Sequence, residues 1–133
     1  ELRAYAALAD EMRDAGIQLI AISPQEPDKT VQAANADPYP FAVLSDSGSK
    51  IARNFGVAFD LHEELRPLYA RLGHALPDMN CGDWILPIPA TYVIAPNGEI
   101  VLAFIDTDYR RRLDPADAMA AAIRANTPRR KAA

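Results

Sequence analysis

Apolar side chains recur every three or four positions at the beginning of the chain. Tyr5, Leu8 and Met12 fall on one face of a helix, while Asp10 falls on the opposite face. Gly16 follows at a position where helices commonly end on a left-handed residue. The pattern predicts an amphipathic helix that ends at Gly16.

Two short apolar runs, each followed by a helical pattern, predict alternation of strands and helices. The run 17–22 is almost entirely apolar, which is typical of parallel strands buried on both faces. A short helix over 29–36 is expected next, with Asp28 as its N-cap. A second strand is expected at 41–44, and small polar residues then precede a helix over 50–55.

The middle of the chain has a weaker pattern. A short strand is expected at 57–59, and leucines at helical spacing predict a helix over 62–72. The stretch 73–88 contains two prolines and follows neither period, so we expect it to be irregular.

The clearest local signal is a hairpin. Runs rich in β-branched residues at 91–95 and 100–105 flank Asn97 and Gly98, a pair that favours a tight hairpin turn. Asp114-Pro115 is expected to start a last helix that continues over 116–125, with Pro115 at its first position. Strands that alternate with helices and end in a hairpin and helix predict an α/β fold.

Length and charge restrict the classes of protein to which this chain can belong. A chain of 133 residues that is 50% hydrophobic suits one domain, placed at 1–126 and followed by a basic tail at 127–133 that we expect to be frayed. The 14 basic and 18 acidic residues give a net charge of −4, which argues against nucleic acid as a partner. No apolar run approaches the roughly 20 residues of a membrane span.

Few side chains suggest metal or cofactor chemistry. Cys81 is the single cysteine, so it forms neither an internal disulfide nor a cysteine-based metal cluster. His62 and His74 lack ligands at metal-site spacing, and we expect no metal. The arginines at 110–112 are expected to form a solvated turn that meets three nearby carboxylates. These are Asp106, Asp108 and Asp114.

Three blocks of sequence occur in an order that is typical of one protein family. They are 16–23 (GIQLIAIS), 41–57 (FAVLSD followed by IARNFGV) and 87–100 (PIPATYVIAPNGEI). Together they resemble the peroxiredoxin (AhpC/TSA) branch of the thioredoxin-like superfamily. The resemblance implies a thioredoxin-like α/β fold, with helices on both faces of a mixed sheet.

The first two residues carry a further resemblance. In this family a nucleophilic cysteine begins a helix, commonly with Glu-Leu three and four residues later, and Glu1-Leu2 resembles that pair. The resemblance implies that the catalytic cysteine precedes Glu1. It also implies that an N-terminal strand, which lies in the family's sheet between the strands at 17–22 and 91–95, is lacking here.

One position departs from the family. Peroxiredoxins usually carry an arginine two residues before the hairpin threonine, which is Thr91 here, and Pro89 stands at that position. Ile88-Pro89 instead resembles the cis-proline of thioredoxins and disulfide reductases, which packs against the reactive thiol. The alternative is a trans proline that bounds an edge strand and has no catalytic role.

The resemblance implies an active site lined by residues from several segments. They are Glu1, Trp84, Ile88, Pro89 and Thr91. Trp84 could equally close the edge of the core. Cys81 is a candidate resolving thiol, and the alternative is a free thiol without a role.

By resemblance, the complete protein is expected to be an antioxidant enzyme that reduces hydroperoxides, with thioredoxin or a small thiol as reductant and no metal or organic cofactor. Peroxiredoxins often dimerise, so a homodimer is a further expectation, and the single cysteine favours the cytoplasm. Two alternatives stay open. One is a disulfide reductase with a Cys-x-x-Cys motif ahead of Glu1, and the other is a thioredoxin-fold binding module without catalysis.

Overall fold

The computed structural model describes residues 1–36 and 38–127, so residues 128–133 of the predicted tail lie outside the described residues. The chain divides into two compact units. The terminal unit comprises Glu1–Leu19 and Pro89–Ala133, and the central unit comprises Ile20–Ile88. A single domain over 1–126 stays a prediction.

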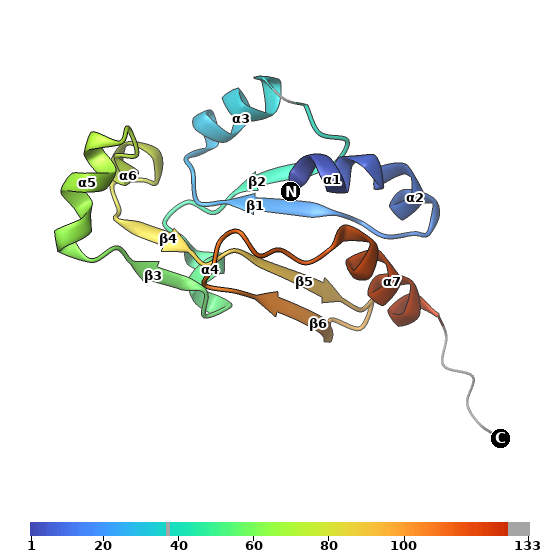
Figure 1. The fold of residues 1–133 in the computed structure, drawn as a ribbon. Helices are drawn as coiled ribbons and strands as arrows, with labels where there is room; N and C mark the ends of the chain where they lie inside the picture. Colours follow the sequence, from blue (N-terminus) through green and yellow to red (C-terminus); the bar gives the residue numbers. More distant parts are fainter. Residues whose placement is uncertain (37, 128–133) are drawn as a thin grey trace. The chain divides into compact units, whose positions relative to one another are not determined.

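The terminal unit combines elements from both ends of the chain (Figure 1). These are the helices α1 (Leu2–Ala7), α2 (Ala9–Asp14) and α7 (Pro115–Asn126) and the strands β5 (Ala90–Ile94) and β6 (Ile100–Ile105). α7 packs on both strands. Its buried residues Ala118 and Ala121 and the buried Val93 of β5 belong to the core of the protein.

The first helix is interrupted. Leu8 leaves the helical region, with φ −103° and ψ 2°, and separates α1 from α2. Each segment buries one large side chain, Tyr5 in α1 and Met12 in α2. Gly16 ends α2 with a φ of +72°, as predicted, while the Ile17 N–H bonds to the Met12 carbonyl over 2.8 Å. The prediction of one continuous helix was therefore wrong in one respect, the break at Leu8.

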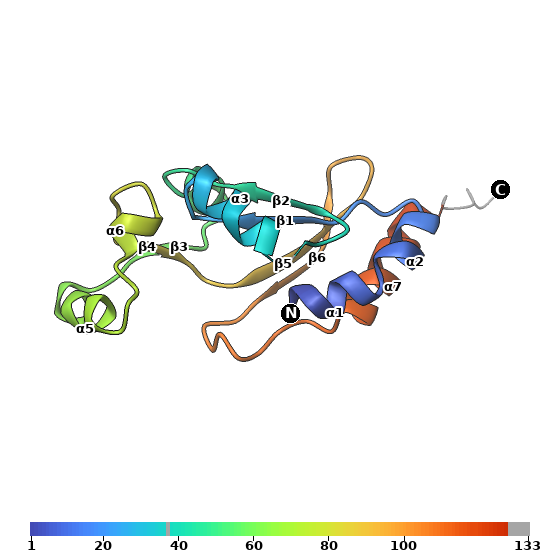
Figure 2. The same ribbon diagram turned by 90° about the horizontal axis from the view of Figure 1, so that it is seen from above.

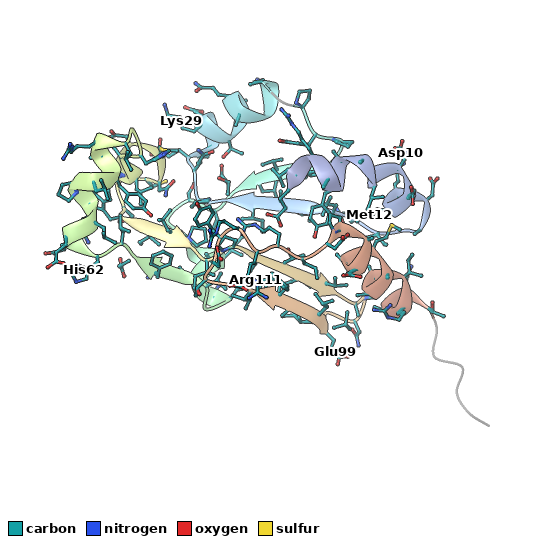
Figure 3. All side chains as sticks on the ribbon, viewed as in Figure 1. Asp10, Met12, Lys29, His62, Glu99 and Arg111 are labelled. Atoms are coloured by element: carbon teal, nitrogen blue, oxygen red, sulfur yellow. The ribbon has the colours of Figure 1, made fainter. Side chains whose placement is uncertain are left out.

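The hairpin and the start of α7 are confirmed. β5 and β6 are antiparallel, and Gly98 takes a left-handed φ of +84° in the turn between them. The side chain of Asn97 accepts a hydrogen bond from the Glu99 N–H at 3.1 Å, and Figure 3 shows Glu99 at this turn. At the start of α7, Asp114 accepts from the Ala116 N–H over 2.8 Å.

The central unit begins with a parallel strand pair. β1 (Ile20–Ser23) pairs with β2 (Ala42–Ser45), and α3 (Pro27–Ala36) connects them. Thr30 of α3 shares a hydrogen bond of 2.7 Å with Ser45. Two predictions were wrong. Alternate residues of β1 are exposed, Ile20 at 44% and Ile22 at 48%, so the strand is not buried on both faces, and α3 begins before Asp28.

A buried carboxylate starts the next helix. Asp46 is 3% exposed and accepts hydrogen bonds from the N–H groups of Ile51 and Ala52, each at 2.9 Å. These N–H groups open α4 (Lys50–Asn54) and have no carbonyl partner earlier in the helix. Ser49 precedes the helix with a left-handed φ of +53°. The predicted polar start of this helix is confirmed, with Asp46 as the side chain that caps it.

The rest of the central unit contains a helix and a strand within 73–88, so the prediction that this stretch is irregular was wrong. Its elements are β3 (Ala58–Asp60), the 3-10 helix η1 (Glu63–Leu65), α5 (Arg66–Arg71), α6 (Leu76–Met79) and β4 (Ile85–Pro87). β4 pairs antiparallel with β3. Leu76 and Ile85 are buried, and burial rather than sequence periodicity stabilises these short elements. Figures 1 and 2 both show α5 and α6 at one extremity of this unit, beyond β3 and β4.

The strands of the described residues are therefore hydrogen-bonded in three pairs, β1–β2, β3–β4 and β5–β6. One pair is parallel and two are antiparallel, with helices beside them, which confirms the mixed α/β class. Among the described residues, no helix is both long enough and apolar enough to cross a membrane.

Candidate active site

Glu1 stands at the start of α1 and is held by an arginine from a distant part of the chain. Arg112 donates from Nε to Glu1 Oε2 over 2.6 Å. The two side chains are only 30% and 29% exposed, so this pair is less hydrated than an ordinary surface ion pair. The Glu1 carbonyl also accepts from the N–H groups of Ala4 and Tyr5, at 2.9 and 3.2 Å. Both the backbone and the side chain of Glu1 are therefore fixed.

Arg112 lies in the loop between β6 and α7, and ion pairs within this loop stabilise it. Asp108 accepts from Nε and Nη2 of Arg110, each at 2.9 Å. Nη1 of Arg111, labelled in Figure 3, lies 3.1 Å from Oδ2 of Asp106. Nη1 of Arg112 donates to the Arg111 carbonyl over 3.0 Å. Arg110 and Arg111 thus pair within the loop, whereas Arg112 reaches α1.

The expected turn of arginines among carboxylates is confirmed at Asp106 and Asp108 but not at Asp114, which caps α7 instead. The hydrogen bonds from Arg110 hold the pKa of the Asp108 carboxyl below its usual value and, reciprocally, raise the pKa of Arg110. Sequence analysis missed the role of Arg112. Arg112 and Glu1 are 111 positions apart in the sequence, so no local sequence pattern indicates their contact.

Tyr5 connects the start of α1 with β5. The residue is 5% exposed, and its buried hydroxyl makes no hydrogen bond of good geometry. Burial raises the pKa of the phenol; the nearby Thr91 side chain lowers it, and the carboxylates of Glu1 and Asp114 raise it further. Thr91, Glu1 and Asp114 therefore all influence the titration of this phenol. A role for Glu1 or Thr91 in lining an active site stays a prediction.

Pro89 requires a correction. Among the described residues no peptide bond is cis, so the Ile88–Pro89 bond is trans and the predicted cis-proline is wrong. The trans isomer is favoured intrinsically by about 0.5–1 kcal/mol, and Pro89 simply precedes the first residue of β5, Ala90. The alternative, a trans proline that bounds a strand, is the one that the structure supports.

The other predicted residues lie in the central unit. Trp84 lies under the guanidinium of Arg66, at 5.8 Å, and its carbonyl accepts from the Leu61 N–H over 2.7 Å. The Ile88 N–H donates to the Val57 carbonyl, also over 2.7 Å. These contacts explain how Trp84 and Ile88 stabilise the surroundings of β3 and β4. A role for either residue in catalysis stays a prediction.

Cys81 is exposed and lies in the turn between α6 and β4. Its φ of +55° is left-handed, an uncommon conformation for a residue with a side chain. The preceding Asn80 is buried and donates from Nδ2 to the Ile85 carbonyl over 3.2 Å. The turn is therefore anchored next to a thiol that solvent can reach. Among the described residues no group of three or more His, Cys, Asp or Glu side chains could hold a metal ion.

Comparison with known proteins assigns most of the chain to one family. Residues 1–103 match a family model described as the AhpC/TSA family. A search of the curated proteins found no match. The match includes Glu1, Cys81, Thr91 and the whole of the central unit. It agrees with the thioredoxin-like α/β class that the sequence blocks predict.

Proposed function

The chain belongs to the AhpC/TSA family, whose general role is thiol-dependent peroxidase or thioredoxin-like redox chemistry, and from this premise we propose that the protein reduces hydroperoxides. The nucleophile in this proposal is a cysteine that precedes Glu1. Peroxide is the substrate, and thioredoxin or a small thiol is the reductant.

The ion pair between Glu1 and Arg112 is the observation that carries the proposal. Glu1-Leu2 resembles the pair that follows the nucleophile in this family, and Arg112 fixes Glu1 with a hydrogen bond of 2.6 Å. A guanidinium stabilises nearby thiolate and can bind oxygen atoms of a substrate. Pro89 replaces the arginine that the family usually carries before the hairpin threonine, and Arg112 places a guanidinium against Glu1.

The reaction follows the ordinary chemistry of thiols. The thiolate attacks one peroxide oxygen, the O–O bond breaks, and the other oxygen leaves as an alcohol or water after it takes up a proton. The sulfur is oxidised to a sulfenic acid. A second thiol then condenses with it, releases water and forms a disulfide, which a dithiol or two small thiols reduce while they are themselves oxidised. This sequence needs no metal or organic cofactor.

Cys81 is our candidate for the second thiol. Its exposure is what a resolving thiol requires, since the sulfur must reach a sulfenic acid and then a reductant. The resemblance of Pro89 to a cis-proline favoured the disulfide-reductase alternative, and the trans bond removes that support. The binding-module alternative predicts no reactive cysteine near Glu1.

The test uses the protein together with the residues that precede Glu1 in its gene. Hydroperoxide consumption is measured by coupling it to thioredoxin oxidation, and the reactive cysteine is located by alkylation and mass spectrometry. We expect turnover and a labelled cysteine three residues before Glu1. Absence of turnover together with absence of a reactive cysteine ahead of Glu1 would refute the proposal, and two cysteines at Cys-x-x-Cys spacing with disulfide reduction alone would favour the reductase.

A further inference from the structure

The loop between β6 and α7 turns two guanidinium groups and an aromatic ring toward solvent. The side chains of Arg110 and Arg111 are 74% and 70% exposed, and Tyr109 is 69% exposed. We call residues 106–112 the arginine loop. Figure 2 shows this loop, in orange, at an outer edge of the terminal unit. Arginine and tyrosine are among the residue types that contribute most to binding energy at protein interfaces.

The carboxylates that pair with these arginines are more covered by protein than the guanidinium groups are. The side chain of Asp108 is 35% exposed and that of Asp106 is 20% exposed. The outermost charges of the arginine loop are therefore positive. A guanidinium carries five N–H donors, and the pair with Asp108 engages two of those of Arg110, at Nε and Nη2. The side chain thus has further donors for the carboxylate of a partner.

Hydrogen bonds within the arginine loop hold its backbone in one conformation. Asp106 Oδ1 accepts from the Asp108 N–H over 2.9 Å, and Asp108 Oδ1 accepts from the Arg110 N–H over 3.1 Å. The Arg111 N–H donates to the Asp108 carbonyl over 2.9 Å. Because this backbone and the two guanidinium groups are already held in place, a partner that binds them has less conformational entropy to remove.

We propose that the arginine loop is the docking surface for the reductant, and that the reductant is a protein dithiol with an acidic surface. This inference rests on the proposed function. Arg112 of the same loop contacts Glu1, which we place three residues after the nucleophile, so a protein docked here lies beside the sulfur that it reduces. Opposite charges on the two surfaces accelerate their association and orient it.

The exchange that follows docking is balanced within the two proteins. A thiolate of the reductant attacks the disulfide of this protein, and one of its two sulfurs leaves as a thiolate. The second thiol of the reductant loses its proton and closes a disulfide within the reductant, which releases the other sulfur. The reductant is oxidised by two electrons, and this protein is reduced by two.

The test compares two reductants in protein that includes the residues preceding Glu1. Thioredoxin from the same organism requires a docking surface, whereas dithiothreitol reaches the disulfide by diffusion. We expect kcat/KM for thioredoxin to fall about fivefold in Arg110→Ala and about tenfold in Tyr109→Ala. Turnover with dithiothreitol and kcat/KM for hydroperoxide should stay unchanged in both variants, because neither depends on docking.

Arg13→Ala is the matched control. The Arg13 side chain is also 70% exposed, and it pairs with an aspartate, Asp10, at 2.8 Å on α2 of the same unit. The substitution removes the same charge outside the arginine loop, so it should leave kcat/KM for thioredoxin unchanged.

Ionic strength provides a second test. A rise from about 0.05 M to about 0.3 M NaCl screens charges across the interface, so kcat/KM for thioredoxin should fall about threefold or more in the unmodified protein and in Arg13→Ala. The fall should be smaller in Arg110→Ala, which has lost one of the two exposed guanidinium groups.

The outcomes separate the docking surface from the proposed function. Absence of turnover with both reductants refutes the proposed function and the docking surface with it. Turnover with dithiothreitol but not with thioredoxin leaves the proposed function standing and overturns the docking surface. Equal losses with thioredoxin in Arg110→Ala and Arg13→Ala, a salt-independent rate, or an equal loss with dithiothreitol in Arg110→Ala overturns it as well.

Discussion

Arg112 and Glu1 are joined by a hydrogen bond of 2.6 Å although 111 positions separate them. The contact links the first helix of the terminal unit to the loop before its last helix. Glu1 resembles the glutamate that follows the nucleophilic cysteine in this family, so this link fixes the part of the chain that we propose to carry the chemistry.

Removal of the guanidinium should impair both activity and stability. In protein that includes the residues preceding Glu1, we expect Arg112→Ala to lower kcat/KM for hydroperoxide by about 10- to 100-fold. The loss of this ion pair, whose side chains are 29% and 30% exposed, should cost about 1 kcal/mol of unfolding free energy, measured with urea. Arg110→Ala removes the same charge from an exposed pair with Asp108 and serves as control. Equal losses of activity in the two variants would argue against a role for Arg112.

Tyr5→Phe should leave the protein as stable at neutral pH or make it more stable by up to about 1 kcal/mol. The substitution removes a buried hydroxyl that makes no good hydrogen bond. Tyr109→Phe, at a tyrosine that is 69% exposed, should have no effect. Thermal unfolding of the three proteins gives the comparison. A loss above about 2 kcal/mol in Tyr5→Phe would mean that the hydroxyl has a strong partner.

The same phenol predicts a pH dependence. Its pKa is raised above 10.0 in the folded protein, so the folded state holds this proton more tightly than the unfolded state does. The contribution of this proton to the free energy of unfolding is fully present below pH 10. It is lost as the pH rises through the raised pKa of the folded protein. Urea unfolding at about pH 8 and about pH 10.5 should show a larger decline for the unmodified protein than for Tyr5→Phe. Identical declines would show that Tyr5 does not titrate with unfolding.

Asp46→Ala should destabilise the central unit by about 2 kcal/mol. Two N–H groups at the start of α4 lose their partner, and a buried site loses its hydrogen bonds. Asp46→Asn keeps one carbonyl acceptor and should cost less. Ser47→Ala, at an exposed position in the same turn, is the control. Urea unfolding followed by circular dichroism measures each, and an unchanged midpoint for Asp46→Ala would exclude the cap.

Cys81→Ser tests the resolving thiol. In protein with the residues that precede Glu1, peroxide should convert the unmodified protein to a disulfide, with a loss of two hydrogens in the mass spectrum. The variant should stop at a sulfenic acid, which gains one oxygen and reacts with dimedone. If Cys81→Ser forms the same disulfide as the unmodified protein, another thiol resolves the intermediate.

Local sequence patterns predicted the elements whose conformation depends on neighbouring residues. The hairpin around Asn97 and Gly98 and the start of α7 at Asp114 follow from turn and capping preferences that act over a few residues. The α/β class and the family followed from the order of the sequence blocks. The expectation that Glu1 and Thr91 line one active site came from the resemblance and not from any local pattern, and it stays a prediction.

The errors have a common origin. The helices and strand within 73–88 are short, and buried side chains such as Leu76 and Ile85 stabilise them where propensity gives no signal. The Ile88–Pro89 bond was expected to be cis because of the resemblance to thioredoxins, but it is trans. The two isomers of a prolyl bond differ little in free energy, so the surrounding structure decides between them. Sequence resemblance cannot supply those surroundings.

The amino-acid sequence alone determined the α/β class, the turn at Asn97 and Gly98, the start of α7 and the family, because each rests on interactions between near neighbours or on motifs in a fixed order. Tertiary structure alone decided that Arg112 reaches Glu1 and that the Tyr5 hydroxyl is buried. The reason is physical: contact and burial depend on how distant segments pack, and one-dimensional spacing does not record that packing.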